Sequence, residues 1–305
     1  MSNITPIKTA EHIQQQKGLF HKPFFIAPSA QVFAERAIRF DELAAEDPSE
    51  WSGYLHLLAQ LCRAQQHVLD THPQSLPPLA QTATLLPTAD GVELPTHFYP
   101  LFRSLLLELK GKVPAVAQTT LDNLASLTYS DAEELACRVL QGTLSPAEAP
   151  YQIWLHAALQ IMWTAWAIQL QEDDVPIIEQ RSHCPCCGSE AVASIVLINN
   201  DLHGLRYQHC PTCNSRWNAL RAKCTFCNDQ SSIALQDISA TPYSALQGAR
   251  AESCDACHNY RKLFMQQHQQ YAEPLADDLA SLPLDILMGE NGYQRGGHNP
   301  FLIIE

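Results

Sequence analysis

Positive charge is scarce in this chain of 305 residues, which carries 19 Lys and Arg residues against 32 Asp and Glu residues and has a net charge of −13. Proteins that bind nucleic acid need clustered Lys and Arg side chains to release counterions from the phosphates. The shortage therefore counts against nucleic acid as the main partner and favours a partner that is itself a protein.

An export signal is also missing, because the first residues, MSNITPIKTAEHIQQQ, contain neither a basic stretch followed by an apolar core nor paired arginines. The longest apolar run, residues 151–170, is interrupted at four-residue steps by Gln152, His156, Gln160 and Thr164. This spacing predicts a polar stripe on a bundle helix and not a membrane span. We therefore expect a cytoplasmic protein, in which grouped cysteines bind metal or carry out redox chemistry more often than they form structural disulfides.

Cysteine and glycine are rare up to about residue 172, where apolar residues recur at three- and four-residue steps. This periodicity predicts six or seven helices, the first of them capped by Ser29. Six prolines between residues 71 and 100 exclude a continuous helix there. After a linker at 171–180, the pattern changes to short β-type runs between cysteines.

Eight of the 11 cysteines form four C-x-x-C pairs, namely Cys184/Cys187, Cys210/Cys213, Cys224/Cys227 and Cys254/Cys257. Eight thiolates suffice for two tetrahedral four-sulfur sites. The spacing between the first and second pairs, and between the third and fourth, leaves room for a β-hairpin that brings two pairs together. We predict that sequential pairs share a metal ion; interleaved pairing is the alternative.

The residue that follows the second cysteine of each pair provides an independent test of the metal hypothesis. A metal knuckle turns through a left-handed conformation at this point, which directs backbone N–H groups at the sulfurs. Glycine adopts positive φ without steric cost, and Asn and His are enriched there among the other residues. The four positions hold Gly188, Asn214, Asn228 and His258. None is β-branched, as a metal knuckle requires.

These patterns predict a multi-domain protein. An N-terminal all-α helical domain is followed by two small β knuckle domains of rubredoxin or zinc-ribbon type, and then by a short C-terminal helix and an extended tail. The predicted boundaries are 1–172, 181–222, 223–270 and 271–305. Because small β units bury little apolar area, we expect each metal ion to hold its own unit together.

Two further groups of residues are candidates for function. Cys186 is surplus to the first site and is interpreted either as a reactive thiol beside the metal or as an exposed residue without a role. Asp277, Asp278 and Asp285 are acidic positions in the otherwise apolar segment ADDLASLPLD. They are candidates for contact with a partner protein, with capping and solvation of a helix as the alternative.

The assembled motifs resemble those of the formate dehydrogenase accessory protein family, FdhE. The resemblance is most specific in the C-terminal half and is weaker, by helical pattern only, in the N-terminal half. It is carried by the segments CPCCGS (184–189), GLRYQHCPTCNSRW (204–217), KCTFCN (223–228), AESCDACHNYRKL (251–263), ADDLASLPLD (276–285) and NPFL (299–302). Two departures are Cys186, where the family usually has another residue, and His258, which replaces the usual glycine.

The resemblance implies a cytoplasmic accessory protein that is required for active formate dehydrogenase and is not itself an enzyme. It implies binding to the catalytic subunit of that enzyme, which contains molybdenum and selenocysteine, before export by the twin-arginine route. It also implies two metal ions in four-cysteine sites, with iron favoured and zinc as the alternative, and a monomer or homodimer. No catalytic residues are predicted.

Two other functions are compatible with the cysteine pattern. A redox role, as a rubredoxin-type electron carrier or a thiol–disulfide enzyme, requires metal or thiols that change oxidation state. A zinc-ribbon protein that binds nucleic acid has the same cysteine spacing, but the acidic composition of this chain disfavours it.

Overall fold

The computed structural model describes residues 22–47, 49, 51–72, 97–179, 181–198, 202–238 and 243–302. Most of the proline-rich stretch, for which the sequence predicts no continuous helix, lies outside the described residues. Among the described helices, none has the length and apolar character needed to cross a membrane.

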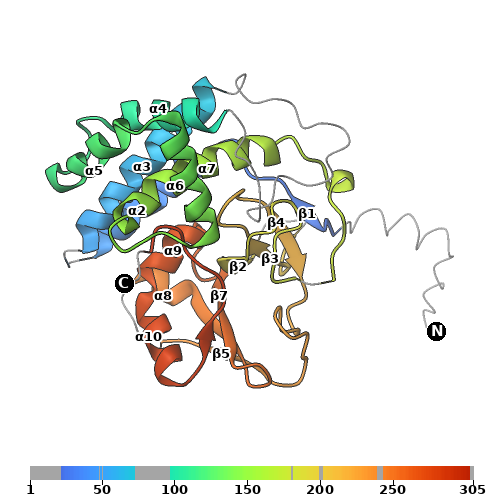
Figure 1. The fold of residues 1–305 in the computed structure, drawn as a ribbon. Helices are drawn as coiled ribbons and strands as arrows, with labels where there is room; N and C mark the ends of the chain where they lie inside the picture. The colour runs from blue at the N-terminus through green and yellow to red at the C-terminus, as the bar shows by residue number, and fades with distance from the viewer. Residues whose placement is uncertain are drawn as a thin grey trace, which may run out of the picture.

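The N-terminal half is helical, as the apolar periodicity predicts, and its described part forms one layer at the top of Figure 1. Two short 3₁₀ turns, at Ala149–Tyr151 and Glu172–Asp174, frame the last helix. The helices are α2 (Val32–Glu46), α3 (Trp51–Thr71), α4 (Phe98–Leu109), α5 (Ala115–Ala125), α6 (Tyr129–Gln141) and α7 (Gln152–Ala167).

The predicted cap of the first of these helices is wrong by two residues. Helix α2 has Gln31 as its N-cap, and the Gln31 side chain makes no capping hydrogen bond. The Ser29 hydroxyl instead accepts the N–H of Gln31 and donates to Glu35, so it stabilises the turn that precedes the helix. The sequence correctly indicated a capping type of residue near the start of the helix. It did not indicate the turn that separates Ser29 from the first helical residue.

The C-terminal half contributes most of a single mixed sheet. Along the sheet the strand order is β1-β4-β3-β2-β7-β6-β5, and β8 pairs with β7 beside this path. The strands are β1 (Phe25–Ile26), β2 (Ala193–Val196), β3 (Arg206–His209), β4 (Arg216–Ala219), β5 (Ile233–Gln236), β6 (Ala249–Cys254), β7 (Asn259–Met265) and β8 (Gln294–Arg295).

The two predicted knuckle units are continuous in space, because β2 of the first pairs in parallel with β7 of the second, with Ile195 opposite Phe264. The N-terminal segment also joins the sheet, since Phe25 of β1 lies opposite Trp217 of β4. Strand β6, which the β-type runs did not indicate, pairs antiparallel with both β5 and β7. The predicted segments therefore meet in one sheet, and their separation into domains stays a prediction.

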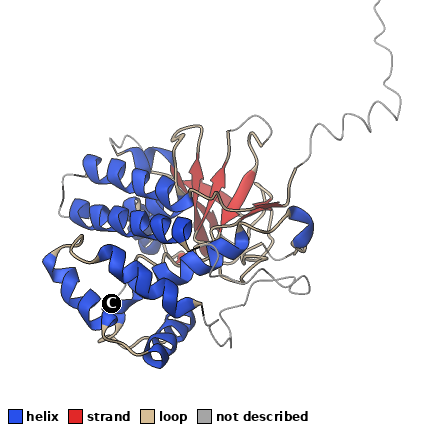
Figure 2. Ribbon diagram, turned by 90° about the horizontal axis from the view of Figure 1, so that it is seen from above, coloured by secondary structure: helices blue, strands red, loops and turns tan. Residues whose placement is uncertain are grey.

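The region after the sheet holds two short helices, α9 (Pro274–Ala280) and α10 (Leu282–Glu290), where one was predicted. A short helix α8 (Ser244–Gly248) lies beside them in Figure 1. Figure 2 shows the long helices gathered on one side of the strands. One buried apolar cluster runs through both regions and includes Trp154 of α7, Trp217 of β4 and Phe301 near the C-terminus.

Candidate metal centres

The eight paired cysteines meet in two groups of four, with the sulfur atoms of each group within 4.8 Å of one another. Cys184, Cys187, Cys210 and Cys213 form the first centre; Cys224, Cys227, Cys254 and Cys257 form the second. This is the sequential grouping and not the interleaved one. All eight are free cysteines, so the sulfurs are not joined as disulfides.

The spacing of the sulfurs fits a tetrahedral metal ion. With metal–sulfur bonds of about 2.3 Å, two sulfurs of a tetrahedral site lie about 3.8 Å apart. In the second centre the Sγ atoms of Cys224 and Cys257 are 3.8 Å apart, and those of Cys227 and Cys254 are 3.7 Å apart. The first centre is slightly tighter, with 3.5 Å between the Sγ atoms of Cys184 and Cys213. Four thiolates at these distances suit Fe or Zn and leave no open coordination position for a substrate.

The left-handed turns predicted for the four knuckles are present. The φ angles are +76° at Gly188, +59° at Asn214, +66° at Asn228 and +54° at His258. Among the described residues, the non-glycine positions with positive φ are Asn214, Asn228 and His258. The imidazole of His258 lies against Tyr293 and is not grouped with the sulfurs. His258 therefore forms the turn of the knuckle and is not a metal ligand.

Backbone N–H groups point at the first sulfur of the knuckles, as the turns require. The N–H groups of Cys186, Thr212 and Phe226 each lie 3.4 Å from the Sγ of the cysteine two residues earlier. Such N–H groups stabilise thiolates, and therefore a metal held by thiolates. Burial opposes this by raising the pKa of Cys184 and Cys210, so a bound cation is needed to keep both deprotonated.

Helix α7 covers the first centre with the polar stripe seen in the sequence. The Gln160 amide donates to the carbonyl of Pro211 at 2.6 Å, and the Asn214 amide donates to the Thr164 hydroxyl at 2.8 Å. Pro211 and Asn214 both belong to the second knuckle. The stripe therefore faces the metal centre inside the protein. The sequence pattern alone predicts only the polar side of a bundle helix.

A buried arginine joins the same knuckle to two helices. Arg36 of α2 donates to the side-chain oxygen Oδ1 of Asn214 at 2.6 Å and pairs with Glu273 at 3.0 Å. Glu273 in turn caps α9 by accepting the N–H groups of Leu275 and Ala276. Burial raises the pKa of Glu273, but the charges of Arg36 and His209 hold it below its usual value. The first centre is thus tied to α2, α7 and α9.

The second centre lies at the surface. Cys224 and Cys254 are buried, Cys227 is exposed and Cys257 is half-buried. Beside this centre, the ring of Phe226 lies 4.4 Å from the guanidinium of Arg261. The cysteines of this centre are absent from the main apolar cluster, which contains all four of the first.

Comparison with known proteins identifies the family to which the chain belongs. Models of the FdhE N-terminal, central and C-terminal domains match residues 21–179, 183–221 and 222–302. The chain belongs to the FdhE family. The resemblance inferred from the cysteine motifs is confirmed.

Individual relatives match over almost their whole length. The FdhE homolog of Haemophilus influenzae is 33% identical over 301 residues, which cover 97% of both chains. The homolog of Pectobacterium carotovorum is 35% identical over 290 residues, with 93% of this chain and 91% of that one covered. The crystal structure of the FdhE protein from Pseudomonas aeruginosa superimposes with a TM-score of 0.81 at 32% identity, covering 92% of this chain and 99% of that chain.

The surplus Cys186, a departure from the family pattern, is buried and not exposed. Its contact with Cys184 lowers the pKa of its thiol, but contact with Cys213 and burial raise it further, and the net result lies well above the ordinary value. A buried, protonated thiol is a poor nucleophile. Its place in the structure therefore favours packing beside the first centre over reactivity.

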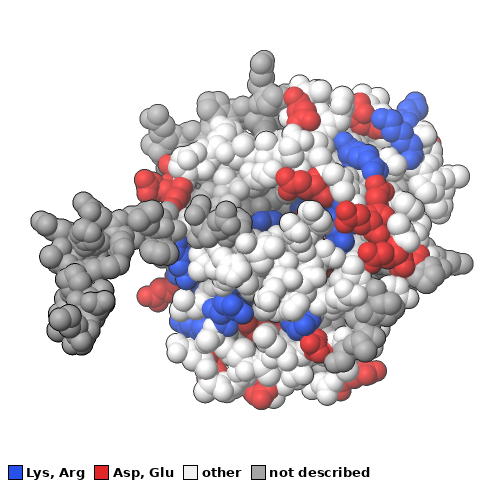
Figure 3. Space-filling view, turned by 180° about the vertical axis from the view of Figure 1, so that it is seen from behind, with Lys and Arg blue, Asp and Glu red and all other residues white. Residues whose placement is uncertain are grey.

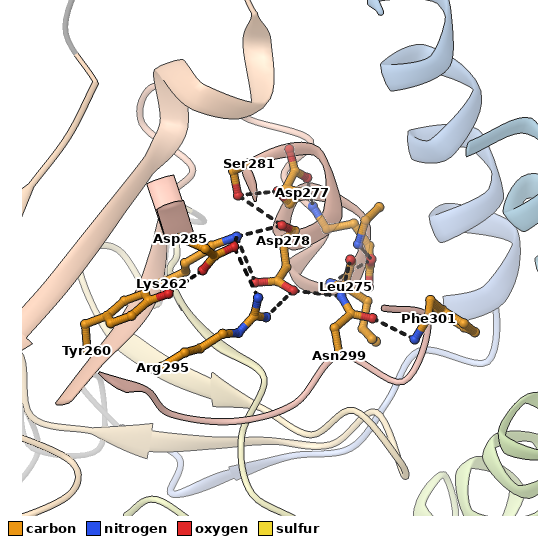
Figure 4. A network of polar contacts seen from close by, with 12 residues as sticks. Tyr260, Lys262, Leu275, Asp277, Asp278, Ser281, Asp285, Arg295, Asn299 and Phe301 are labelled. Carbon is orange, nitrogen blue, oxygen red and sulfur yellow. Dashed lines mark hydrogen bonds and ion pairs between the residues drawn. The ribbon is translucent and has the colours of Figure 1, made fainter. Parts of the chain in front are cut away.

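The three candidate aspartates form part of an internal network (Figure 4). Asp277 pairs with Arg39 at 2.6 Å, and Asp278 pairs with Arg295 at 2.5 Å. Asp285 pairs with Lys262 at 2.5 Å. Asp277 and Asp278 are 0% exposed, so they are neither solvated nor presented at the surface.

This network anchors the C-terminal segment to the sheet. Burial raises the pKa of Asp278, but the nearby charges of Lys262 and Arg295 lower it below its usual value. The Asn299 amide donates to the Asp278 carboxylate at 2.8 Å, and the Phe301 N–H donates to the Asn299 side-chain carbonyl (Figure 4). We infer that the motifs ADDLASLPLD and NPFL hold the tail in place.

Proposed function

We propose that this protein is an accessory protein for formate dehydrogenase, which binds the catalytic subunit of that enzyme in the cytoplasm before the subunit is exported. The role is one of binding and maturation and not of catalysis. The observation that carries the proposal is membership of the FdhE family along the whole chain, together with the two four-cysteine centres that the fold brings together.

The centres support binding over chemistry on a substrate. Each would hold one ion through four sulfurs, without a free coordination position, as structural sites do. The family resemblance favours iron, and zinc fits the same donor set. A bound ion would therefore supply rigidity to the surfaces around it and, in the case of iron, a one-electron couple.

The direct test is anaerobic co-purification with the formate dehydrogenase catalytic subunit, with metal counted per chain. We expect a complex with two ions in each copy of this protein. Cys227→Ser should remove the ion of the second centre, and Cys137→Ser, a change outside both centres, should remove none. If the folded Cys227→Ser protein still binds the subunit, the second ion is purely structural; failure of the wild-type protein to bind would refute the proposal.

A rubredoxin-type electron carrier is the second candidate, favoured by the exposure of Cys227 at the second centre. An iron ion at that position would lie within reach of a redox partner. Visible absorbance that dithionite bleaches, and that Cys227→Ser diminishes, would support this role. A colourless protein loaded with zinc in the cell would rule it out.

Binding to nucleic acid has the least support. The visible part of the face in Figure 3 intersperses Lys and Arg with Asp, Glu and wide uncharged areas, with no continuous basic surface. Several cations of the strand region are also engaged inside the protein, such as Arg206, which pairs with Glu252 at 2.7 Å. A gel shift at low salt would overturn this conclusion.

A further inference from the structure

A groove of about 370 Å³ lies directly over the first metal centre. Its walls come from α6, from α7 and from the C-terminal segment around residues 295–300, and its floor comes from the two knuckles of the first centre. We call it the knuckle groove. Its size is within the range of about 300–1,000 Å³ that is usual for ligand sites.

The floor of the knuckle groove is connected to the metal-binding sulfurs by hydrogen bonds. The Ser189 hydroxyl lies 3.4 Å from the Sγ of Cys187 and donates to the Thr212 hydroxyl at 2.9 Å. The Thr212 N–H points at the Sγ of Cys210. A molecule in the groove would therefore touch Ser189 and Thr212, which contact the sulfurs of the first centre.

One wall presents the ring of a largely buried histidine. Two residues of the α7 stripe, Gln160 and Thr164, bond to the knuckle, whereas His156 faces the groove. His156 is 9% exposed, and its Nδ1 atom has no hydrogen-bond partner among the described residues. The Nδ1 atom itself is enclosed by the protein, so the part of His156 that lines the groove is the rest of its ring.

The charged groups at the groove are neutralised within the protein. Arg295 pairs with Asp278 at 2.5 Å and with Asp285 at 3.2 Å, and Glu190 pairs with Arg261 at 2.9 Å. No net charge is thus left to attract a phosphate. In the described residues, the candidate metal clusters are the two four-cysteine groups, so the groove is not a third one.

The remaining groups suit a neutral ligand with both donors and acceptors. Gln152, His298 and the two hydroxyls of the floor offer hydrogen bonds, while Val139 and Pro300 offer apolar contact. Gln152 and His298 lie 3.2 Å apart across the mouth. A polypeptide backbone with small or apolar side chains has this combination of alternating N–H and C=O groups and apolar surface.

We propose that the knuckle groove binds a short, uncharged segment of the partner polypeptide, which packs against the exposed part of the His156 ring. The inference rests on the proposed function and names the part of the surface that performs it. Docking of the segment depends on the first centre, because that centre builds the floor.

The test compares two matched substitutions in the full-length, metal-loaded protein. Val139→Trp fills the groove, and Val116→Trp places the same side chain on α5, where Val116 is 84% exposed. We expect Val139→Trp to weaken binding of the purified formate dehydrogenase catalytic subunit at least about tenfold, or about 1.4 kcal/mol. Val116→Trp should leave the dissociation constant unchanged. Equal affinities of the two variants would overturn the inference while the proposed function stands.

A photocrosslinking experiment covers the case in which Val139→Trp does not fold. A photoreactive phenylalanine derivative replaces Gln152 at the groove in one protein and the exposed Gln169 in a second. Crosslinks to the catalytic subunit from position 152 and not from 169 are expected. Crosslinks only from 169, or from 152 to another copy of this chain, would overturn the inference. If the wild-type protein does not bind the subunit at all, the proposed function fails as well.

Discussion

The two metal centres have the same four-cysteine composition but opposite environments. The first is enclosed by α2, α7 and α9 and belongs to the main apolar cluster, with Cys210 and Cys213 0% exposed. The second lies at the end of β6 and β7, with Cys227 at the surface. The comparison shows that identical ligand sets can perform different tasks, because the surroundings decide how far loss of the ion spreads.

The largest difference is expected from removing one ligand of each centre. A structural ion contributes about 10–16 kcal/mol, which is comparable to the whole stability of a domain, about 5–15 kcal/mol. Cys210→Ser should therefore abolish cooperative folding of the sheet and the helices packed on it. Cys227→Ser should lose one ion and leave the helices folded. Far-UV circular dichroism melts and metal counts per chain provide the measurement.

If Cys227→Ser also unfolded the helical region, the two centres would form one cooperative unit and the comparison would fail. Cys137→Ser on α6 is the control for replacing a cysteine that is not a ligand. It should retain both ions and the wild-type melting profile.

The next largest effect is expected at Arg36, which joins the first centre to the helices. Arg36→Met leaves Glu273 and Asn214 without their buried partner, and breaking a buried ion pair in this way costs about 3–5 kcal/mol. The matched control is Arg63→Met, which breaks the exposed pair of Arg63 with Asp41 and should cost about 0–1 kcal/mol. Denaturant unfolding of both variants measures the difference; equal losses would mean that the buried link does not stabilise the first centre.

The rates at which a chelator removes the metal should also differ between the two centres. The second centre opens to solvent without disturbing the main core, whereas the first requires at least local opening of α7 or α9. We expect two phases, the faster at least about tenfold more rapid, which corresponds to about 1.4 kcal/mol of extra opening free energy. Cys227→Ser should retain only the slow phase. A single phase of two equivalents in the wild-type protein would contradict the proposed asymmetry.

The smallest expected effect concerns pH at the cover of the first centre. Burial, with a smaller contribution from His298, lowers the pKa of His156 from 6.5 to about 3. The unfolded chain binds a proton near pH 6.5 that the folded chain excludes, so this contribution to stability is complete above pH 6.5 and declines as the pH falls from 6.5 toward 3.

At about pH 5.5 the loss relative to neutral pH should be on the order of 1 kcal/mol. His156→Gln should lack this component, so the difference between the two proteins isolates it from the pH dependence that metal binding gives to both. Unfolding free energies in denaturant at the two pH values provide the measurement. Parallel pH profiles would show that His156 is not held neutral.

Much of the candidate site could be predicted because its signals are local. The C-x-x-C spacing and the residues Gly188, Asn214, Asn228 and His258 encode the knuckle turns, and all four turns have the left-handed geometry that these residues favour. The α7 stripe was also visible, but its partner was not, since Pro211 and Asn214 are about fifty residues away in the chain.

The features that could not be predicted depend on contacts between distant segments. The sequence contains no local signal for the parallel pairing of β2 with β7, or for β1 joining β4. Arg36 and Glu273, which support the first centre, are 237 residues apart. A search for polar residues on apolar helix faces would have indicated Arg36 as a candidate for a buried link.

Local chemistry alone therefore favoured the sequential grouping of the cysteine pairs and determined how each knuckle turns, because a turn depends on the φ angles of a few adjacent residues. Assembly of the chain decided that one centre is enclosed and the other open, that Asp277 and Asp278 are internal, and that a groove lies over the first centre. Burial is a property of what packs around a residue, and the segments that pack around these residues come from both ends of the chain.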